Sequence, residues 1–381
     1  MKNGSLLKKF TILLAFILLA GALYLFINQG ESYSVKKPTP KIKAITVSEI
    51  AAITGQESVN KTEERYDIKG TDLGSIFDMK GKLYFVFGDT FGAGSMLPPG
   101  TGSTSYWRSN VVGYSTDMDP SDGVKLDGFL EDVNGKAKEI IPSNKIQGNH
   151  LTSIPTYGVA LENNMYLFYM AVDSWGDPGV WNTSFSGVYK SSDEGKTWEP
   201  VEDLQWDGGS NFIQVAIVKP DQNKEVLGDD IYFYGVKAGR YSSIQLMKVN
   251  KDKIEDMNSY LYFTGTDSDG KPQWTSQEKE AKDILKTTAG ELSVVWNSEL
   301  QRWIMTYING TTTNIDIVEA ENPWGPWTDP MVMVAQSDYP GLYGSYMHPA
   351  FIKNEGKTIY FSMSRWGTYN SYIMKADLEL E

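Results

Sequence analysis

From about Arg65 to the C-terminus the chain repeats one pattern, in which an apolar strand and a turn rich in Gly, Asn or Asp precede a strongly aromatic strand. Five segments begin this pattern: Thr71–Asp78, Thr152–Leu161, Asn211–Lys219, Glu291–Asn297 and Ser345–Lys353. Their spacing is unequal, which is more typical of propeller blades with variable loops than of a sandwich. We therefore predict an all-β fold, a five-bladed β-propeller, over residues 61–381.

The N-terminal segment has a different character. Residues 1–9 are short and basic, and residues 10–27 are uncharged and nearly all apolar, which is long enough to span a bilayer. No clear cleavage site follows. The pattern predicts a cytoplasmic tail at 1–9, a transmembrane signal-anchor helix at 10–27 and a linker with a lead-in at 28–60. The expected location is the cell membrane with the propeller outside, or secretion if the signal is cleaved.

Composition narrows the classes of ligand. The net charge of −13 disfavours nucleic acid and anionic membrane surfaces as partners. The absence of Cys excludes disulfides and thiolate metal sites, and two His make a multi-His metal centre improbable. With 22 Tyr and 11 Trp, the chain suits a sugar-binding surface. We expect a monomer with no cofactor, no metal and a polysaccharide or cell-wall glycan as its partner.

The strongest catalytic candidates are Asp72 and Asp89, which open and close the hairpin at residues 70–90. In an antiparallel hairpin these two positions share one end of the sheet, and paired carboxylates there suit acid–base chemistry on a glycosidic bond. Glu291 begins the fourth repeat and supplies a third acid facing the same axis. The alternative is that Asp72 caps a turn and Asp89 is a solvated loop residue.

Further candidates come from the starts of the inner strands and from the loops that follow strands. The converging set would comprise Asp72, Thr152, Ser153, Asn211, Glu291, Tyr346 and His348. Candidate substrate-binding residues are Trp107, Arg108, Asn110, His150, Asp173, Trp175, Tyr346, His348 and Arg365. Structural roles are the open alternative for several of them: Arg108 would hold loop carbonyls, the tryptophans would pack loops, and each His would form a structural hydrogen bond.

Two other motifs predict structure rather than chemistry. Residues 191–198 match the Asp-box, Ser-x-Asp-x-Gly-x-Thr-Trp, in which the Asp and Thr side chains bind the amides of a hairpin turn. Residues 267–270 resemble part of a calcium loop but lack its downstream ligands, so a plain turn is the better interpretation.

Eight ordered strings resemble the bacterial family catalogued as domain of unknown function 4185 over roughly residues 65–381: GTDLGSIFD, FGDTFG, WRSNVVGYSTD, HLTSIPTYGVAL, SSDEGKTW, ELSVVWNSELQRWIMTY, NPWGPWTDP and YGSYMHPAFI. The resemblance implies a five-bladed propeller. Some members of that family are endo-acting D-arabinofuranan hydrolases, glycoside hydrolase family 183. For this chain the resemblance implies hydrolysis of arabinofuranosyl linkages, with the family's acids falling on Asp72 and Asp89.

Two hypotheses follow. The first is a surface-exposed glycoside hydrolase that cleaves a furanose-containing polysaccharide with a carboxylate pair in the propeller funnel. The alternative is a non-catalytic glycan-binding propeller at the cell surface, using the same aromatic residues. A sialidase is disfavoured, because only one Asp-box and no second convincing Arg motif are present.

Overall fold

The computed structural model describes residues 40–381, and the predicted tail, signal anchor and first part of the linker lie outside this range. The regular secondary structure of the described part is mainly β-strand, with a few short helices, so the predicted all-β class is confirmed. Among residues 40–381 no helix is both long enough and apolar enough to cross a membrane.

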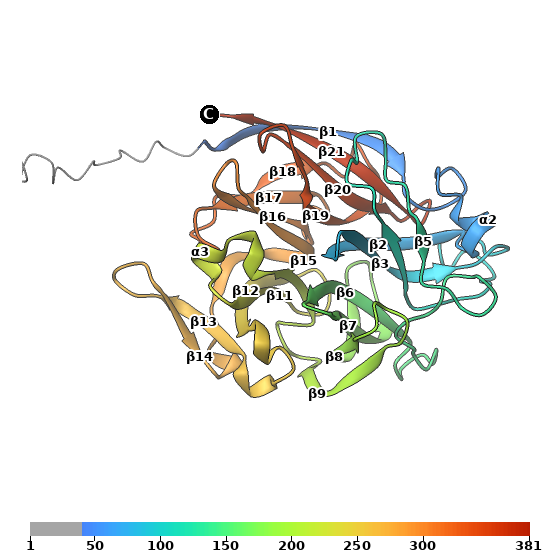
Figure 1. Ribbon diagram of the computed structural model, residues 1–381, viewed down its shortest axis with the longest axis horizontal. Coiled ribbons are helices and arrows are strands. Elements are labelled where there is room, and N and C mark those ends of the chain that lie inside the picture. The colour runs from blue at the N-terminus through green and yellow to red at the C-terminus, as the bar shows by residue number, and fades with distance from the viewer. Residues whose placement is uncertain (1–39) are drawn as a thin grey trace, which may run out of the picture. The chain divides into compact units, whose positions relative to one another are not determined.

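The strands form four antiparallel sheets, and the largest of these, with nine strands, comprises two units, so that five units surround a common centre (Figure 1). The first contains β2 (Gly70–Met79), β3 (Lys82–Phe91), β4 (Val111–Ser115) and β5 (Gly128–Phe129). The second contains β6 (Thr152–Leu161), β7 (Asn164–Trp175), β8 (Trp181–Ser191) and β9 (Glu199–Asp207). The third contains β10 (Gln214–Val218), β11 (Asp230–Val236), β12 (Ser242–Asn250), β13 (Leu261–Thr266) and β14 (Pro272–Thr275).

The fourth unit contains β15 (Asp283–Asn297), β16 (Arg302–Asn309), β17 (Ile315–Ala320) and β18 (Met331–Val334). The fifth contains β19 (Leu342–Lys353), β20 (Thr358–Arg365), β21 (Asn370–Leu380) and, from the other end of the domain, β1 (Ile42–Ala52). The innermost strands β2, β6, β10, β15 and β19 all overlap the five predicted repeat segments, so these segments were correctly identified from the sequence.

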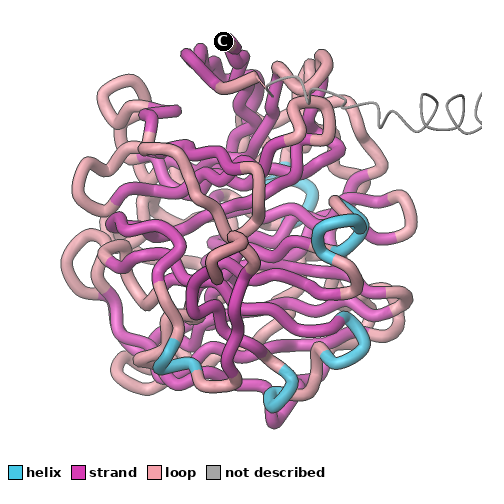
Figure 2. Tube along the Cα trace, turned by 90° about the vertical axis from the view of Figure 1, so that its left-hand side faces the viewer, coloured by secondary structure: helices cyan, strands magenta, loops and turns pink. Residues whose placement is uncertain are grey.

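Helices are few and short, and they lie among loops and turns (Figure 2). They are α2 (Thr62–Tyr66), η1 (Pro220–Gln222), α3 (Lys224–Leu227), η2 (Lys251–Lys253), η3 (Met257–Ser259) and η4 (Glu278–Glu280).

The ring is closed by β1, which pairs antiparallel with the last strand, β21. Its register places Ile45 opposite Leu378 and Val47 opposite Ala376, so the outermost strand of the fifth unit comes from the start of the domain. The propeller therefore begins before residue 61, because residues 42–52 add a fourth strand to a sheet whose last strand would otherwise be an open edge.

Packing between the units uses large apolar side chains. Phe85, Phe233, Trp303 and Phe361 come from the second strands of four units and are completely buried. The third and fourth units are further joined where β12 pairs with β15, for example Ile244 with Leu285. Burial of this kind holds the five units together and fixes the inner strands around the centre.

The Asp-box forms the turn between β8 and β9 and has the predicted structural role. Asp193 Oδ1 accepts from the Thr197 amide at 2.9 Å, and Asp193 Oδ2 accepts from the Thr197 hydroxyl at 2.7 Å. Trp198 donates its ring N–H to the Gly195 carbonyl at 2.9 Å. These bonds lie within the outer hairpin of the second unit.

Candidate active site

All five units contribute to one cavity of about 680 Å³, which opens at the ends of the inner strands where those strands begin. Asp72 of β2, Thr156 of β6, Gln214 of β10, Glu291 of β15 and Tyr343 of β19 all line it. The site thus combines residues from every repeat, as the convergence of inner strands predicts.

A local irregularity in the first hairpin brings Asp72 beside Asp89. Thr71 pairs with Thr90 but Leu73 pairs with Phe87, so Asp72 alone lies opposite both Gly88 and Asp89. Leu73 has a φ of 63°, an uncommon value for a residue other than glycine. Bulges of this kind re-aim side chains and are frequent beside active sites.

Gly88 is required by the position of Asp72. A Cβ atom at residue 88 would collide with Asp72 Oδ1. The glycine of the FGDT string therefore makes room for the neighbouring carboxyl group. The sequence shows this glycine, but only the register of the hairpin shows why it is there.

The Asp72 carboxyl group is held in a poorly solvated position. Its Oδ2 accepts from the Tyr343 hydroxyl at 2.9 Å, and Oδ1 is inaccessible with no hydrogen-bond partner among residues 40–381. Burial, together with the charge of Asp89, raises the pKa of Asp72 to about 7. A neutral carboxyl group suits such a site, because an unpaired buried carboxylate oxygen is costly.

Asp89 is also buried, but its carboxyl group accepts two side-chain hydrogen bonds, one more than that of Asp72. Its Oδ1 accepts from the Thr152 hydroxyl at 2.6 Å and from the Trp107 ring N–H at 2.8 Å. Burial raises the pKa of Asp89 to about 6, against the opposing effect of those two donors. Because both donors bind Oδ1, they fix the carboxylate and leave Oδ2 to act on a substrate.

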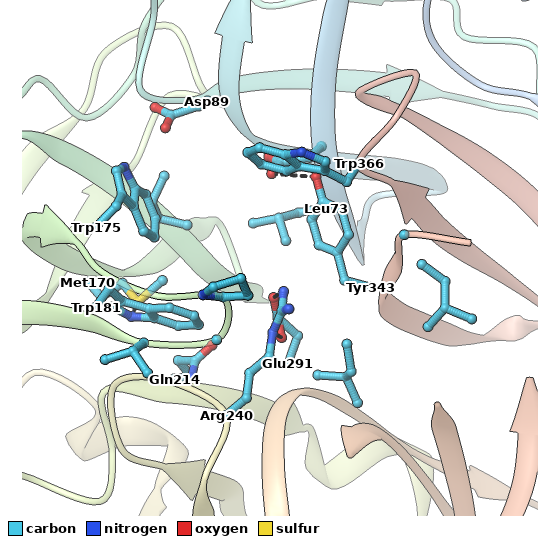
Figure 3. Close-up of a pocket in the computed structure, with 18 of the residues that line it drawn as sticks. Leu73, Asp89, Met170, Trp175, Trp181, Gln214, Arg240, Glu291, Tyr343 and Trp366 are labelled. Carbon is cyan, nitrogen blue, oxygen red and sulfur yellow. Dashed lines mark hydrogen bonds and ion pairs between the residues drawn. The ribbon is translucent and has the colours of Figure 1, made fainter. Parts of the chain in front are cut away.

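Glu291 lies on the cavity wall in a two-point ion pair with Arg240 (Figure 3). Arg240 Nε donates to Oε2 at 2.8 Å and Arg240 Nη2 donates to Oε1 at 2.6 Å. Burial lowers the pKa of Arg240, but the charge of Glu291 outweighs it and raises that pKa overall. A carboxylate with both oxygens engaged by a guanidinium is poorly suited to accept or deliver a proton, so Glu291 differs from the acid pair Asp72 and Asp89.

Aromatic rings form much of the remaining wall. Trp175 and Tyr346 line the cavity, in the place predicted for them. Trp181, Tyr343, Trp366 and Tyr369 also line it and were not among the predicted site residues. The sequence did contain a signal for two of them, since Trp181 lies shortly after the candidates Asp173 and Trp175, and Trp366 directly follows the candidate Arg365.

Three predicted substrate-binding residues beside Asp89 have other roles. Arg108 is buried and donates to the carbonyls of Ala137 at 2.9 Å and Asp67 at 2.5 Å, so it holds loops together. Asn110 is buried and donates to the carbonyls of Ile141 and Ser153. Trp107 does not line the cavity and instead positions Asp89 through its ring N–H.

His150 and Asp173 lie together but outside the cavity. Asp173 Oδ1 accepts from the His150 amide at 2.9 Å and from the Ser184 hydroxyl at 2.7 Å. His150 Nε2 pairs with the Ser153 hydroxyl at 2.7 Å. These bonds stabilise the loop before β6, and the expectation that both side chains line the funnel is wrong.

Arg365 and Asn211 are also displaced from the site. Arg365 Nη2 pairs with Glu49 of β1 at 3.0 Å, and its guanidinium lies 3.8 Å from the centre of the Tyr372 ring. Asn211 precedes β10, where Gln214 occupies the cavity wall instead. Asn211 was misplaced because the start of its strand was estimated three residues too early, whereas Arg365 does end its strand but turns toward β1.

His348 lies at the opposite end of the inner strands. It lines a second cavity of about 240 Å³ with Asp78 and Lys219. Its Nδ1 accepts from the Ala350 amide at 3.2 Å, so Nε2 carries the proton and donates to Asp78 Oδ1 at 3.3 Å. β19 extends well past the first cavity, and His348 follows Tyr343 by five positions along that strand.

We also searched the described residues for side chains that could together bind a metal ion. Among residues 40–381 no group of three or more His, Asp or Glu side chains is placed to hold a metal ion. Asp267 accepts from the amides of Asp269 and Lys271 at 2.9 Å each, as expected of a plain turn.

Comparison with known proteins supports the fold and gives the family. A crystal structure from Bacteroides ovatus, provisionally described as a hydrolase, superposes with a TM-score of 0.58 at 13% identity, covering 87% of this chain and 90% of that one. A GH43_1 enzyme from Xanthomonas citri gives a TM-score of 0.47 at 13% identity, with 81% and 87% covered. The likeness to the Bacteroides protein, at this identity, concerns the fold alone.

Sequence relatives extend over most of the domain. Notoamide biosynthesis cluster protein J of Aspergillus sp. (strain MF297-2) is 26% identical over 322 residues, which covers 79% of this chain and 81% of the Aspergillus protein. The profile described as "Domain of unknown function (DUF4185)" matches residues 57–375. The chain therefore belongs to the DUF4185 family.

Proposed function

We propose that this protein is a surface-exposed glycoside hydrolase that cleaves a furanose-containing polysaccharide, with endo-acting hydrolysis of D-arabinofuranan as the first activity to test. The observation that carries the proposal is the acid pair, in which two neighbouring buried carboxyl groups have raised pKa values of about 7 and about 6 within an aromatic cavity. Two carboxyl groups with separated pKa values can divide the roles of acid and base.

Asp72 is the proposed general acid. With a pKa of about 7 it holds its proton in weakly acidic solution and transfers it to the glycosidic oxygen as the bond from that oxygen to the anomeric carbon breaks. Tyr343 orients the carboxyl group through Oδ2. The neighbouring Asp89 carboxylate favours the protonated form of Asp72.

Asp89 is the proposed partner of that acid. It either removes a proton from the attacking water or attacks the anomeric carbon itself. Thr152 and Trp107 position it by donating to the same oxygen. The anomeric configuration of the first product, measured by NMR, distinguishes these two roles, since direct water attack inverts the configuration and a covalent intermediate retains it.

The test is to incubate the full-length protein with arabinans, galactans and teichoic-type glycans and to analyse released oligosaccharides by chromatography. We expect products from at least one furanose-containing polysaccharide and none from the Asp72→Asn or Asp89→Asn variants. Hydrolysis that persists at full rate in both folded variants would refute the assignment of the acid pair.

The second candidate is a non-catalytic glycan-binding propeller. One observation favours it: Asp72 Oδ1 is inaccessible, so only one oxygen of that carboxyl group is left to meet a substrate. Binding of a polysaccharide without release of any product from the whole panel would support this alternative over hydrolysis.

A further inference from the structure

Two tryptophans stand out at the mouth of the cavity because they are large, apolar and exposed. Trp175 is 45% exposed and Trp366 is 48% exposed, although both line the cavity. A soluble protein gains nothing in stability from leaving such rings in water, so exposed indoles at a cavity rim indicate a binding surface.

Each exposed indole is held by a buried ring behind it. Trp175 packs edge-to-face on Trp181 with ring centres 5.7 Å apart, and Trp366 packs edge-to-face on Tyr369 with ring centres 5.5 Å apart. Trp181 and Tyr369 are 8% and 3% exposed. The two platforms are thus similarly supported, which reduces the loss of side-chain freedom when a ligand stacks on them.

The platforms lie on two sides of the acid pair. Figure 3 shows Trp175 and Trp366 across the opening from each other, with Asp89 on the wall between them and Arg240 and Glu291 facing it. Tyr369, the ring behind Trp366, lies close enough to Asp72 to lower the pKa of that carboxyl group. A ligand in contact with both indoles therefore passes the acid pair.

Charge in the cavity restricts the ligand further. Four carboxyl groups line the cavity, those of Asp72, Asp89, Asp177 and Glu291, and the guanidinium of Arg240 is already paired with Glu291. Within residues 40–381, the hydrogen bonds of Arg240 to Glu291 use its Nε and Nη2 atoms. Its Nη1 is therefore available to donate to a neutral oxygen, such as that of a hydroxyl group. An added carboxylate would meet excess negative charge here.

We propose that the ligand of this cavity is a neutral glycan of at least two sugar rings, one stacked on Trp366 and one on Trp175, with the linkage between them at the acid pair. The inference rests on the proposed function for the position of the bond that is cleaved. The stacking and the charge preference concern binding and are testable without any turnover.

The test uses the full-length Asp72→Asn variant, in which turnover is blocked. Its binding to neutral arabinofuranosyl and xylosyl oligosaccharides of one to four units is measured by calorimetry, alongside the same sugars oxidised to carry carboxylates. We expect affinity to rise from one unit to two or more, and to fall by about tenfold for the oxidised forms.

Adding Trp175→Ala or Trp366→Ala to this variant should each weaken binding of the longer sugars by about tenfold, the effect of one aromatic contact. The matched control is Trp198→Ala, which removes an indole from the Asp-box at the outer edge of the second unit. That control should lower thermal stability but leave sugar affinity unchanged.

The proposal is overturned if no neutral oligosaccharide binds, if the oxidised sugars bind as well, or if neither rim substitution weakens binding. Failure of the proposed function looks different. There, the wild-type protein binds the neutral sugars with the same dependence on Trp175 and Trp366 but releases no product.

Discussion

Asp72 and Asp78 lie at opposite ends of β2, six residues apart, and their pKa values are shifted in opposite directions. Burial and the charge of Asp89 raise the pKa of Asp72. Burial would also raise the pKa of Asp78, but the hydrogen bond from His348 and the charge of Lys219, whose Nζ lies 2.8 Å away, lower it below its ordinary value. Residue type and strand are the same, so the deeper burial of Asp72 and the cationic partners of Asp78 account for the difference.

The two ends of the inner strands therefore differ in how their carboxyl groups are paired with cations. The end with Asp72 has carboxyl groups that lack cationic partners of their own, apart from Glu291 with Arg240. The end with Asp78 has its charges paired in a chain of Lys219, Asp221 and His348. The paired end is suited to stabilise the fold, whereas the unpaired end is suited to chemistry.

The largest expected effect is the loss of hydrolysis in Asp72→Asn. Removing a general acid should lower kcat by about 10²- to 10⁴-fold. Asp78→Asn, the same substitution at the other end of the strand, is the control and should retain activity. Equal losses in both variants, measured on the same polysaccharide, would show that the two ends are not functionally distinct.

The next effect concerns Gly88. Gly88→Ala should displace the Asp72 carboxyl group and lower kcat/KM by about a hundredfold, since small misplacements of catalytic groups are costly. Gly367→Ala is the control, because an added Cβ there meets nothing within 4 Å. Circular dichroism should show both variants folded. Full activity in Gly88→Ala would mean that the position of Asp72 does not matter.

The pH dependence of kcat/KM should be bell-shaped, with an acid limb near pH 6 from Asp89 and an alkaline limb near pH 7 from Asp72. The Tyr343 hydrogen bond lowers the pKa of Asp72, so Tyr343→Phe should move the alkaline limb to higher pH. Thr152→Val should likewise move the acid limb to higher pH. Limbs that stay in place would exclude these groups as the titrating pair.

The smallest effect is on stability. Asp78→Asn should lower the free energy of unfolding at pH 7 by about 1 kcal/mol, a modest value because Asp78 is partly exposed. The native pKa of Asp78 is depressed, so its contribution is present above the unfolded pKa of about 4 and is lost as pH falls below it. Urea denaturation at pH 7 and pH 3 measures this.

Asp72 should show the opposite dependence in the same experiment. Its native pKa is raised, so the folded state binds a proton more tightly and stability falls as pH rises from about 4 to about 7. Asp72→Asn should remove that fall and make the protein more stable than wild type at pH 8. A wild-type stability that rises over this range, with no change in the variant, would contradict the raised pKa.

Much of the fold followed from local patterns. The five repeats, their aromatic second strands and the Asp-box turn each depend on residues close together in the sequence. The closing strand β1 was missed because its partner, β21, lies at the other end of the domain. No local pattern distinguishes a lead-in strand from one that completes the last sheet.

The site residues likewise divide into those that local sequence patterns predicted correctly and those that they misplaced. Asp72 and Asp89 were identifiable because one hairpin holds both, and Tyr346 and Trp175 because inner strands and their loops converge. Arg108, Asn110 and Arg365 were assigned to the site because charged and polar residues follow strands there, but burial turned them toward backbone carbonyls or β1. His348 was placed at the wrong end because its strand is long.

The sequence by itself determined the all-β class, the five inner-strand segments, the hairpin that carries Asp72 and Asp89, and the family. Only the tertiary structure decided that Glu291 is neutralised by Arg240, that Trp107 and Thr152 fix Asp89, and that Trp366 and Tyr369 stand beside Asp72. The reason is physical. Strand and turn formation depend on near neighbours, whereas burial and charge pairing, which set a pKa, depend on residues that folding brings together from different blades.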